Sequence, residues 1–324
     1  MKLIISDEFS ASSKELFNFI SNPKNLELVY PKKLKVKVVE VPERLGKGSI
    51  VRMNSVILGQ NFEWKLIIKD HKENEGFIDE ALESPFKYWK HEHKIKSINE
   101  KKTLMEDIIE FKTFLGFLGD GFASKIIKNI IEYRNLKIKQ YFGEKTDKIE
   151  YKDPTVIDLK LGLLLCIIMS LLGFVLPIIS PKDLIFGLIF NFIAWFLLWF
   201  FTHDLAHFIT GYLLGIRFSY FYLGLSNLVK AIPFKRIKFL FLVLGLKINR
   251  KRSKASKYRF AVMYFAGPLA SMILPFYVPI YLFLYKYNLL AFIFLFLSLI
   301  NLIITLIFSP KYGCIHKGLN KLKE

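Results

Sequence analysis

The feature that most constrains this chain is a set of long apolar runs in its second half. They are Leu161–Ile179, Leu184–Phe201, Phe260–Leu284 and Leu289–Phe308. A helix needs about 20 predominantly apolar residues to cross the hydrocarbon core of a bilayer. The sequence therefore predicts an all-α transmembrane domain of about four helices over residues 157–310. Within it, Ile216–Leu225 and Phe239–Ile248 are apolar but too short to span, and they could form a re-entrant hairpin or a pair of interfacial strands.

Basic residues predict how these helices are oriented. The connection between the second and third runs carries Lys235, Arg236, Lys238, Lys247, Arg250, Lys251, Arg252, Lys254 and Lys257. The links at 180–183 and 285–288 carry one lysine each. Since Lys and Arg concentrate in cytoplasmic loops, we expect a multi-pass protein of the cell membrane. Residues 1–145 and a basic tail, 311–324, would then lie in the cytoplasm.

The formal net charge of +19 does not indicate a nucleic-acid-binding protein. After Asp204 no acidic residue occurs until Glu324, and the basic residues there stand between apolar runs. This arrangement is typical of a membrane face, so we expect the lipid bilayer as a partner, and no nucleic acid. Two cysteines, Cys166 and Cys314, are too few for a disulfide framework and indicate a reducing compartment.

Residues 1–145 have the pattern of a soluble α+β domain. After an initial strand, Ser12 or Ser13 is expected to cap a helix over 14–20, which Pro23 ends. A last helix with a broad apolar stripe is expected over 122–141. An antiparallel sheet curved around that helix would bury the stripe. Turn residues separate the predicted strands, which are 34–41, 49–58, 62–69, 76–82, 88–97 and 103–113.

This order of elements resembles the START-like or SRPBCC superfamily, the helix-grip fold. The resemblance covers about residues 1–143 and includes Ser-Pro-Phe-Lys-Tyr-Trp-Lys-His-Glu-His at 84–93 and Thr-Leu-Met-Glu-Asp-Ile-Ile-Glu-Phe at 103–111. It implies a hydrophobic small molecule or a lipid as ligand, held between the sheet and the last helix. A linker, 146–156, would join this domain to the membrane helices.

Two histidines in the first half are candidate ligand-binding residues. His91 and His93 lie two apart on a predicted strand and share one face with Trp89. They could bind a ligand headgroup or a metal ion, or could be polar lining or surface residues. Three acidic residues of this region are expected to be solvated strand residues: Glu106, Asp107 and Glu110. Arg134 in the last helix is expected either to be solvated or to pair with an acidic residue.

A candidate metal site lies in His203-Asp-Leu-Ala-His207, at the end of the second apolar run. Histidines four residues apart share one helix face, so both imidazoles can reach one Zn²⁺. In the zinc-protease pattern H-E-x-x-H the glutamate is the general base, and here the shorter Asp204 replaces it. The alternative is a pair of interfacial polar residues, although ionisable residues at membrane depth are usually functional.

A catalytic zinc site also needs a third protein ligand. Cys314 and His316 are the candidates, because they follow the fourth run and are expected on the same side of the membrane as His203 and His207. Cys314 is preferred. The alternatives are a cysteine that only packs and a histidine in a solvated tail.

The second half resembles the site-2 protease family of intramembrane zinc metalloproteases, over about residues 157–320. His203-Asp-Leu-Ala-His207 matches the position of the family's H-E-x-x-H, and Ala-Gly-Pro-Leu-Ala-Ser at 266–271 is similar to its A-G-P-x-A-N segment. Residues 309–317 lie where the family has L-D-G. The resemblance implies that Asp204 replaces the catalytic glutamate and that Cys314 replaces a zinc-ligating aspartate.

These patterns predict a membrane-embedded zinc metallopeptidase-like protein with a cytoplasmic START-like domain and a membrane-protein substrate. The alternative is a non-catalytic, membrane-anchored protein that binds a lipid or another hydrophobic molecule and has a degenerate protease-like half. A transporter with His203 and Asp204 in a proton path is a third interpretation. Four spans without an internal repeat make the transporter the least favoured of the three.

Overall fold

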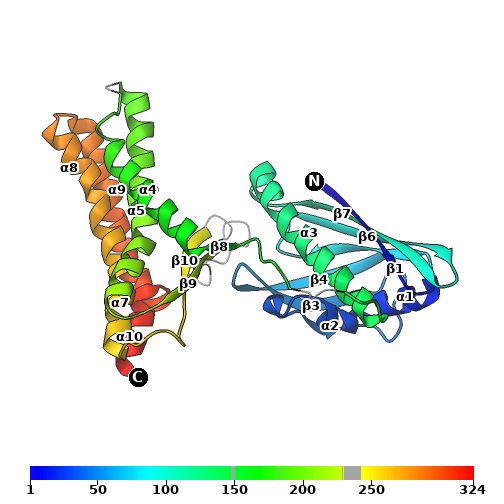
Figure 1. The fold of residues 1–324 in the computed structure, drawn as a ribbon. Helices are drawn as coiled ribbons and strands as arrows, with labels where there is room; N and C mark the ends of the chain where they lie inside the picture. The colour runs from blue at the N-terminus through cyan, green and yellow to red at the C-terminus, as the bar shows by residue number, and fades with distance from the viewer. Residues whose placement is uncertain (147–149, 182, 228, 230–241) are drawn as a thin grey trace. The chain divides into compact units, whose positions relative to one another are not determined.

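The computed structural model describes residues 1–146, 150–181, 183–227, 229 and 242–324. The chain divides into two compact units, unit 1 from Met1 to Thr155 and unit 2 beginning at Val156 (Figure 1). Lys235, Arg236 and Lys238 of the predicted basic connection, and 147–149 of the predicted linker, lie outside the described residues. The rest of the predicted linker up to Thr155 belongs to unit 1, where Asn129 donates a hydrogen bond to the carbonyl oxygen of Lys152.

Unit 1 is a seven-stranded antiparallel sheet in the order β1-β7-β6-β5-β4-β3-β2. The long helix α3 covers one face of this sheet (Figure 1). The predicted order of one strand, a helix, six strands and a long helix is confirmed. The elements are β1 (Lys2–Phe9), α1 (Ser13–Ile20), α2 (Leu26–Val29), β2 (Lys37–Glu40), β3 (Ile50–Ile57), β4 (Gln60–Lys72), β5 (Gly76–Glu83), β6 (Tyr88–Asn99), β7 (Lys102–Lys112) and α3 (Gly116–Tyr141).

Local sequence explains where α1 begins. The Ser12 hydroxyl accepts a hydrogen bond from the Glu15 N–H, and the Glu15 carboxylate accepts one from the Ser12 N–H. This capping box satisfies two donors that the first turn leaves free, and it makes Ser12 the cap. Helix α3 begins at Gly116, before the predicted start at Phe122.

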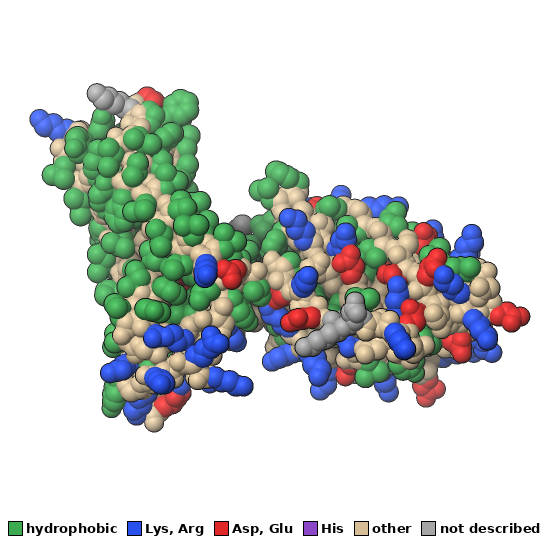
Figure 2. All heavy atoms as spheres, viewed as in Figure 1, with side chains coloured by type: hydrophobic (Ala, Val, Ile, Leu, Met, Phe, Trp, Pro, Cys, Tyr) green, Lys and Arg blue, Asp and Glu red, His purple; other side chains and the backbone are tan. Residues whose placement is uncertain are grey.

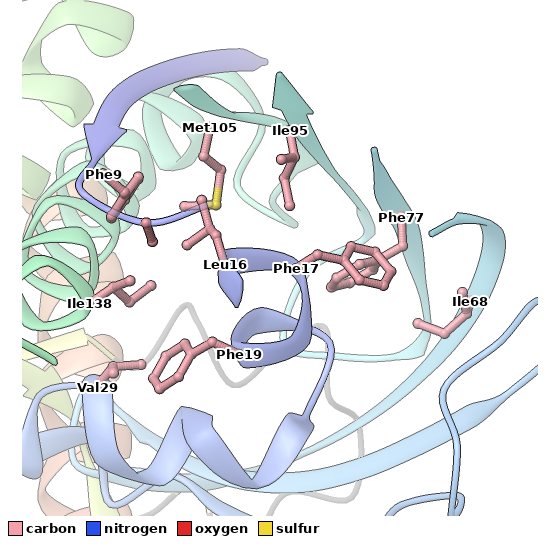
Figure 3. Close-up of a cluster of buried hydrophobic side chains, with 11 residues drawn as sticks. Phe9, Leu16, Phe17, Phe19, Val29, Ile68, Phe77, Ile95, Met105 and Ile138 are labelled. Carbon is pink, nitrogen blue, oxygen red and sulfur yellow. The ribbon is translucent and has the colours of Figure 1, made fainter. Parts of the chain in front are cut away.

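The core of unit 1 lies between the sheet and the helices. Alternate residues of β7 (Met105, Ile109 and Phe111) are fully buried, as expected for a strand with one face turned to the core. Figure 3 shows one core cluster, in which Phe9 of β1, Leu16 of α1 and side chains of β4–β7 and α3 gather. This face also carries the polar groups described below.

Unit 2 is mainly helical. Among the described residues, three helical stretches are long and apolar enough to cross a membrane: Leu184–Leu213, Lys257–Leu284 and Asn288–Tyr312. The first predicted span forms the shorter apolar helix α4 of 17 residues. The helices are α4 (Leu159–Val175), α5 (Leu184–Leu213), α7 (Lys257–Ile273), α8 (Tyr277–Leu284), α9 (Asn288–Tyr312) and α10 (Cys314–Lys323).

Unit 2 is not all-α: of the two alternatives for its short apolar segments, the structure shows strands. β8 (Val156–Asp158), β9 (Phe218–Leu225) and β10 (Leu242–Ile248) form a three-stranded antiparallel sheet. The pairing of β9 with β10 satisfies the backbone N–H and C=O groups of two segments that are too short to span a membrane. Phe221 of β9 is fully buried against the α4 helix, where a Cβ on Gly162 would overlap its ring.

Residues 311–324 are not an extended tail. Most of them form α10, which packs against α7, and Gly318 fits closely against the ring of Phe265. Lysine and arginine side chains gather at the end of unit 2 that holds α10, whereas the sides of the helices are apolar (Figure 2). Because α10 begins at Cys314 and packs against α7, this cysteine lies within the helical bundle.

Candidate metal centre

Three of the predicted ligands converge in unit 2. His203 and His207 lie one turn apart on α5, and Cys314 begins α10; their ligand atoms all lie within 4.8 Å of one another. The two Nε2 atoms are 3.2 Å apart, and Cys314 Sγ is 3.7 Å from His203 Nε2. Tetrahedral zinc with ordinary bond lengths requires about 3.3 Å between two nitrogens and about 3.6 Å between nitrogen and sulfur. The three side chains therefore fit zinc in these positions.

The other ring nitrogens fix the tautomers of both histidines. His207 Nδ1 lies 2.6 Å from the carbonyl oxygen of Met263, which can only accept a hydrogen bond. His203 Nδ1 lies 3.2 Å from Ser271 Oγ, and the Ser271 hydroxyl donates to the carbonyl oxygen of Pro268 at 3.1 Å. This network assigns the proton to Nδ1 in both rings, and each Nε2 then presents a lone pair.

The donor set also fits a metal chemically. Two Nε2 lone pairs that face each other at 3.2 Å repel unless a positive centre lies between them. Burial raises the pKa of the Cys314 thiol to about 11, so the free thiol is protonated at neutral pH. A bound zinc ion would hold this sulfur as the thiolate.

Helix α7 supports the site through a glycine. A Cβ at Gly267 would overlap the imidazole ring of His207, so this close approach requires glycine. Helix α9 adds Asn301, whose Nδ2 donates to the carbonyl oxygen of Ser271 at 2.9 Å. The segment 266–271 therefore positions both histidines, Gly267 by contact with one ring and Ser271 by a hydrogen bond to the other.

The remaining predicted site residues lie beside the three ligands. Asp204 is 4% exposed, but it is not among the converging ligand atoms. His316 is exposed and lies outside the group. Its two ring nitrogens are each 3.0 Å from a partner, the carbonyl oxygen of Pro310 and the side-chain nitrogen of Asn320.

A second polar cluster lies in unit 1, at His91 and His93. His91 is 4% exposed, and its Nε2 lies 2.9 Å from Asp107 Oδ1; burial and the neighbouring His93 lower its pKa. His93 is 9% exposed, and its Nε2 lies 3.3 Å from Asp79 Oδ2. Trp89 is half-buried and packs beside His91, with ring centroids 6.2 Å apart. The structure therefore brings all three predicted residues to one region of the sheet.

The expectation that Asp107 is solvated was wrong, because it is fully buried in an ion pair with the equally buried Arg134 of α3. Burial alone would raise the pKa of Asp107, but Arg134 and the two histidines hold it well below its usual range. Strand alternation could have revealed this position, since Asp107 lies two residues from the buried Met105 and Ile109.

A pocket of about 760 Å³ opens elsewhere in unit 1, beside α1. Its walls come from α1 and the segment that follows it, from β2 and its connection to β3, and from the end of β4. The lining combines apolar side chains with basic and acidic ones, among them Phe17, Val39, Leu45, Lys24, Arg44 and His71.

No protein-family model and no curated protein matches the sequence. Solved structures of START-like type are similar to the N-terminal part of the chain. A START superfamily protein from Mycobacterium smegmatis has a TM-score of 0.37 and 14% identity, over 44% of this chain and 96% of that chain. A protein from Thermus thermophilus has a TM-score of 0.37 and 14% identity, over 44% and 97%. An aromatase/cyclase from a Streptomyces species has a TM-score of 0.33 and 13% identity, over 44% and 90%.

Proposed function

We propose that this chain is a membrane-embedded zinc metallopeptidase-like protein, with zinc held by His203, His207 and Cys314. The convergence of these three side chains, with both Nδ1 atoms already engaged, supports the proposal most strongly. Three protein ligands leave one tetrahedral position open, as catalytic zinc sites do. The substrate would be a membrane protein, because the ligands belong to a bundle of membrane-crossing length.

Asp204 would be the general base of this site. Zinc, when bound, polarises the substrate carbonyl and lowers the pKa of water. Asp204 follows His203 directly and would take the proton from the attacking water and deliver it to the leaving amine.

The basic end of unit 2 supports an orientation of its helices in the membrane. We propose that the end with α10 faces the cytoplasm, because lysine and arginine gather there (Figure 2). Unit 1 would then be a cytoplasmic domain of a multi-pass membrane protein. Its START-like arrangement would bind a lipid or another hydrophobic molecule, for which the 760 Å³ pocket beside α1 has an ordinary ligand-site volume.

A second candidate function is non-catalytic binding. The ligand set of unit 2 contains a thiolate, which donates more electron density to a metal than a carboxylate does and weakens activation of water. The base is also an aspartate, one methylene shorter than the usual glutamate. In this case unit 2 anchors the protein and unit 1 carries the function, through its hydrophobic ligand.

Substitution of Asp204 separates the two candidates. Detergent-purified protein would be incubated with a panel of transmembrane-helix peptides, and new termini would be detected by mass spectrometry. The peptidase predicts cleavage that Asp204→Asn abolishes while zinc is retained, and that Asp204→Glu preserves. If wild-type and Asp204→Asn protein treat every peptide alike, the catalytic function is wrong and the binding function is favoured.

A further inference from the structure

We propose that unit 1 contains a second metal site, formed by His91, His93 and Asp79, for a divalent transition metal such as Zn²⁺ or Fe²⁺. This site is independent of the metal centre in unit 2, since all three ligands lie in the sheet of unit 1. Each residue offers one ligand atom, and these atoms lie within 4.8 Å of one another.

The sheet register places the three side chains on one face. His91 and His93 are two residues apart on β6, and Asp79 of β5 is directly opposite His91. Side chains in such positions project from the same side of a sheet. Two histidines and one carboxylate on one side of an ion form the facial arrangement that binds divalent iron and related metals.

The electrostatics of the cluster call for a cation. Asp79 is 5% exposed, and its described ion-pair partner is His93 rather than a lysine or arginine. The guanidinium of Arg134 is engaged by Asp107 and by the side-chain oxygen of Asn135. With neutral imidazoles, Asp79 would be a buried carboxylate without a compensating charge, which is costly. Either a proton on His93 or a metal ion supplies that charge.

One buried nitrogen of the cluster makes no hydrogen bond. His93 Nδ1 lies 3.2 Å from Asp107 Oδ1, but the approach lacks hydrogen-bond geometry. Because His93 Nδ1 faces Asp107, the nitrogen available to a metal is His93 Nε2, which lies 3.3 Å from the proposed ligand oxygen of Asp79. A metal bond at Nε2 would fix the ring proton on Nδ1, which lies beside Asp107 Oδ1.

Asp107 would orient one of the ligands. Its Oδ1 accepts from His91 Nε2 at 2.9 Å, which leaves His91 Nδ1 to face the metal. Arg134 holds Asp107 in turn, and ligating histidines are commonly positioned by such a carboxylate. Three protein ligands on one side leave coordination positions open for water or for an oxygen donor of a small ligand.

Metal content of a chain that lacks the first site tests this proposal. The full-length His203→Ala/His207→Ala protein would be purified in detergent without chelator and loaded separately with Zn²⁺ and, without oxygen, with Fe²⁺. We expect about one metal ion per chain. Adding His91→Ala should remove it, and Asp79→Asn should weaken binding at least about tenfold. Glu80→Gln, next to Asp79 on β5 but paired with Lys69 outside the cluster, should leave metal binding unchanged.

A second measurement, the thermal unfolding temperature with and without metal, does not depend on variants of unit 1 that could misfold. In the His203→Ala/His207→Ala chain, added metal should raise the unfolding temperature of unit 1, and a chelator should reverse the rise. Absence of both bound metal and thermal shift with either ion would overturn the proposal, as would full retention of metal after His91→Ala. Failure of the unit 2 centre gives a different result, because the wild-type chain would then hold only the ion that His91→Ala removes.

Discussion

The imidazole ring of His207 lies directly against Gly267, at a distance that leaves no room for a Cβ. Gly267→Ala must therefore push α7 or the histidine away. We expect zinc affinity to fall at least about tenfold and stability to fall by about 1–3 kcal/mol. Zinc competition with a chromophoric chelator measures the first effect. Gly121→Ala in α3, where a Cβ meets nothing within 4 Å, should leave zinc binding unchanged; equal effects from both alanines would contradict this account.

Ser271 is the hydrogen-bond partner of His203 Nδ1, at 3.2 Å. Ser271→Ala removes the group that orients this ring, so zinc should bind about 10–100-fold more weakly. The matched control is Ser298→Ala, since Ser298 is also buried in unit 2 but accepts a hydrogen bond from Trp195. The same zinc titration applies to both variants. The assigned role fails if the two lose equal affinity.

The ion pair of Asp107 and Arg134 predicts a large loss of stability in unit 1. Arg134→Met leaves the Asp107 carboxylate buried without its arginine and should destabilise unit 1 by about 3–5 kcal/mol. Hydrogen exchange of the β6 and β7 amides in the full chain measures this opening free energy.

Two further variants test whether the buried charge causes this loss of stability. Lys128→Met removes an exposed partner of Glu132 on the same helix and should cost less than about 0.5 kcal/mol. The double variant Asp107→Asn/Arg134→Met should lose less stability than Arg134→Met alone, because no buried charge is left unpaired. A double variant that is less stable than the single one would rule out this explanation.

The capping box of α1 predicts a local effect. Ser12→Ala removes the acceptor for the Glu15 N–H and should weaken α1 by about 1 kcal/mol. Hydrogen exchange of the peptide that covers α1 should therefore become about fivefold faster. Ser13→Ala next to it should have little effect, and the opposite ranking would make Ser13 the true cap.

The element order of unit 1 was predictable because its strands alternate and its helix ends carry clear signals. Ser12 with Glu15 marks the start of α1, and the β7 residues Met105, Ile109 and Phe111 mark a buried face. The burial of Asp107 was missed because a charged residue was assigned to solvent by its type. Its position in the alternation was the better guide.

The candidate metal centre was predictable only in part. The spacing of His203 and His207 places both on one helix face, and the end of the last span brings Cys314 to the same end of the bundle. The partner of His207 Nδ1 is a backbone carbonyl, that of Met263, and no residue type encodes it. In the unit 2 sheet only β8 was missed, because it is distant in sequence from β9 and β10.

Cobalt substitution tests the metal centre of unit 2 most directly. Cobalt bound by a thiolate gives a near-ultraviolet charge-transfer band, and the chain has only two cysteines, Cys166 and Cys314. The detergent-purified full chain loaded with Co²⁺ should show this band. Cys314→Ser or His203→Ala/His207→Ala should abolish it, and Cys166→Ser should leave it intact. A chain without the band, or a band that survives Cys314→Ser, would contradict a metal held by His203, His207 and Cys314.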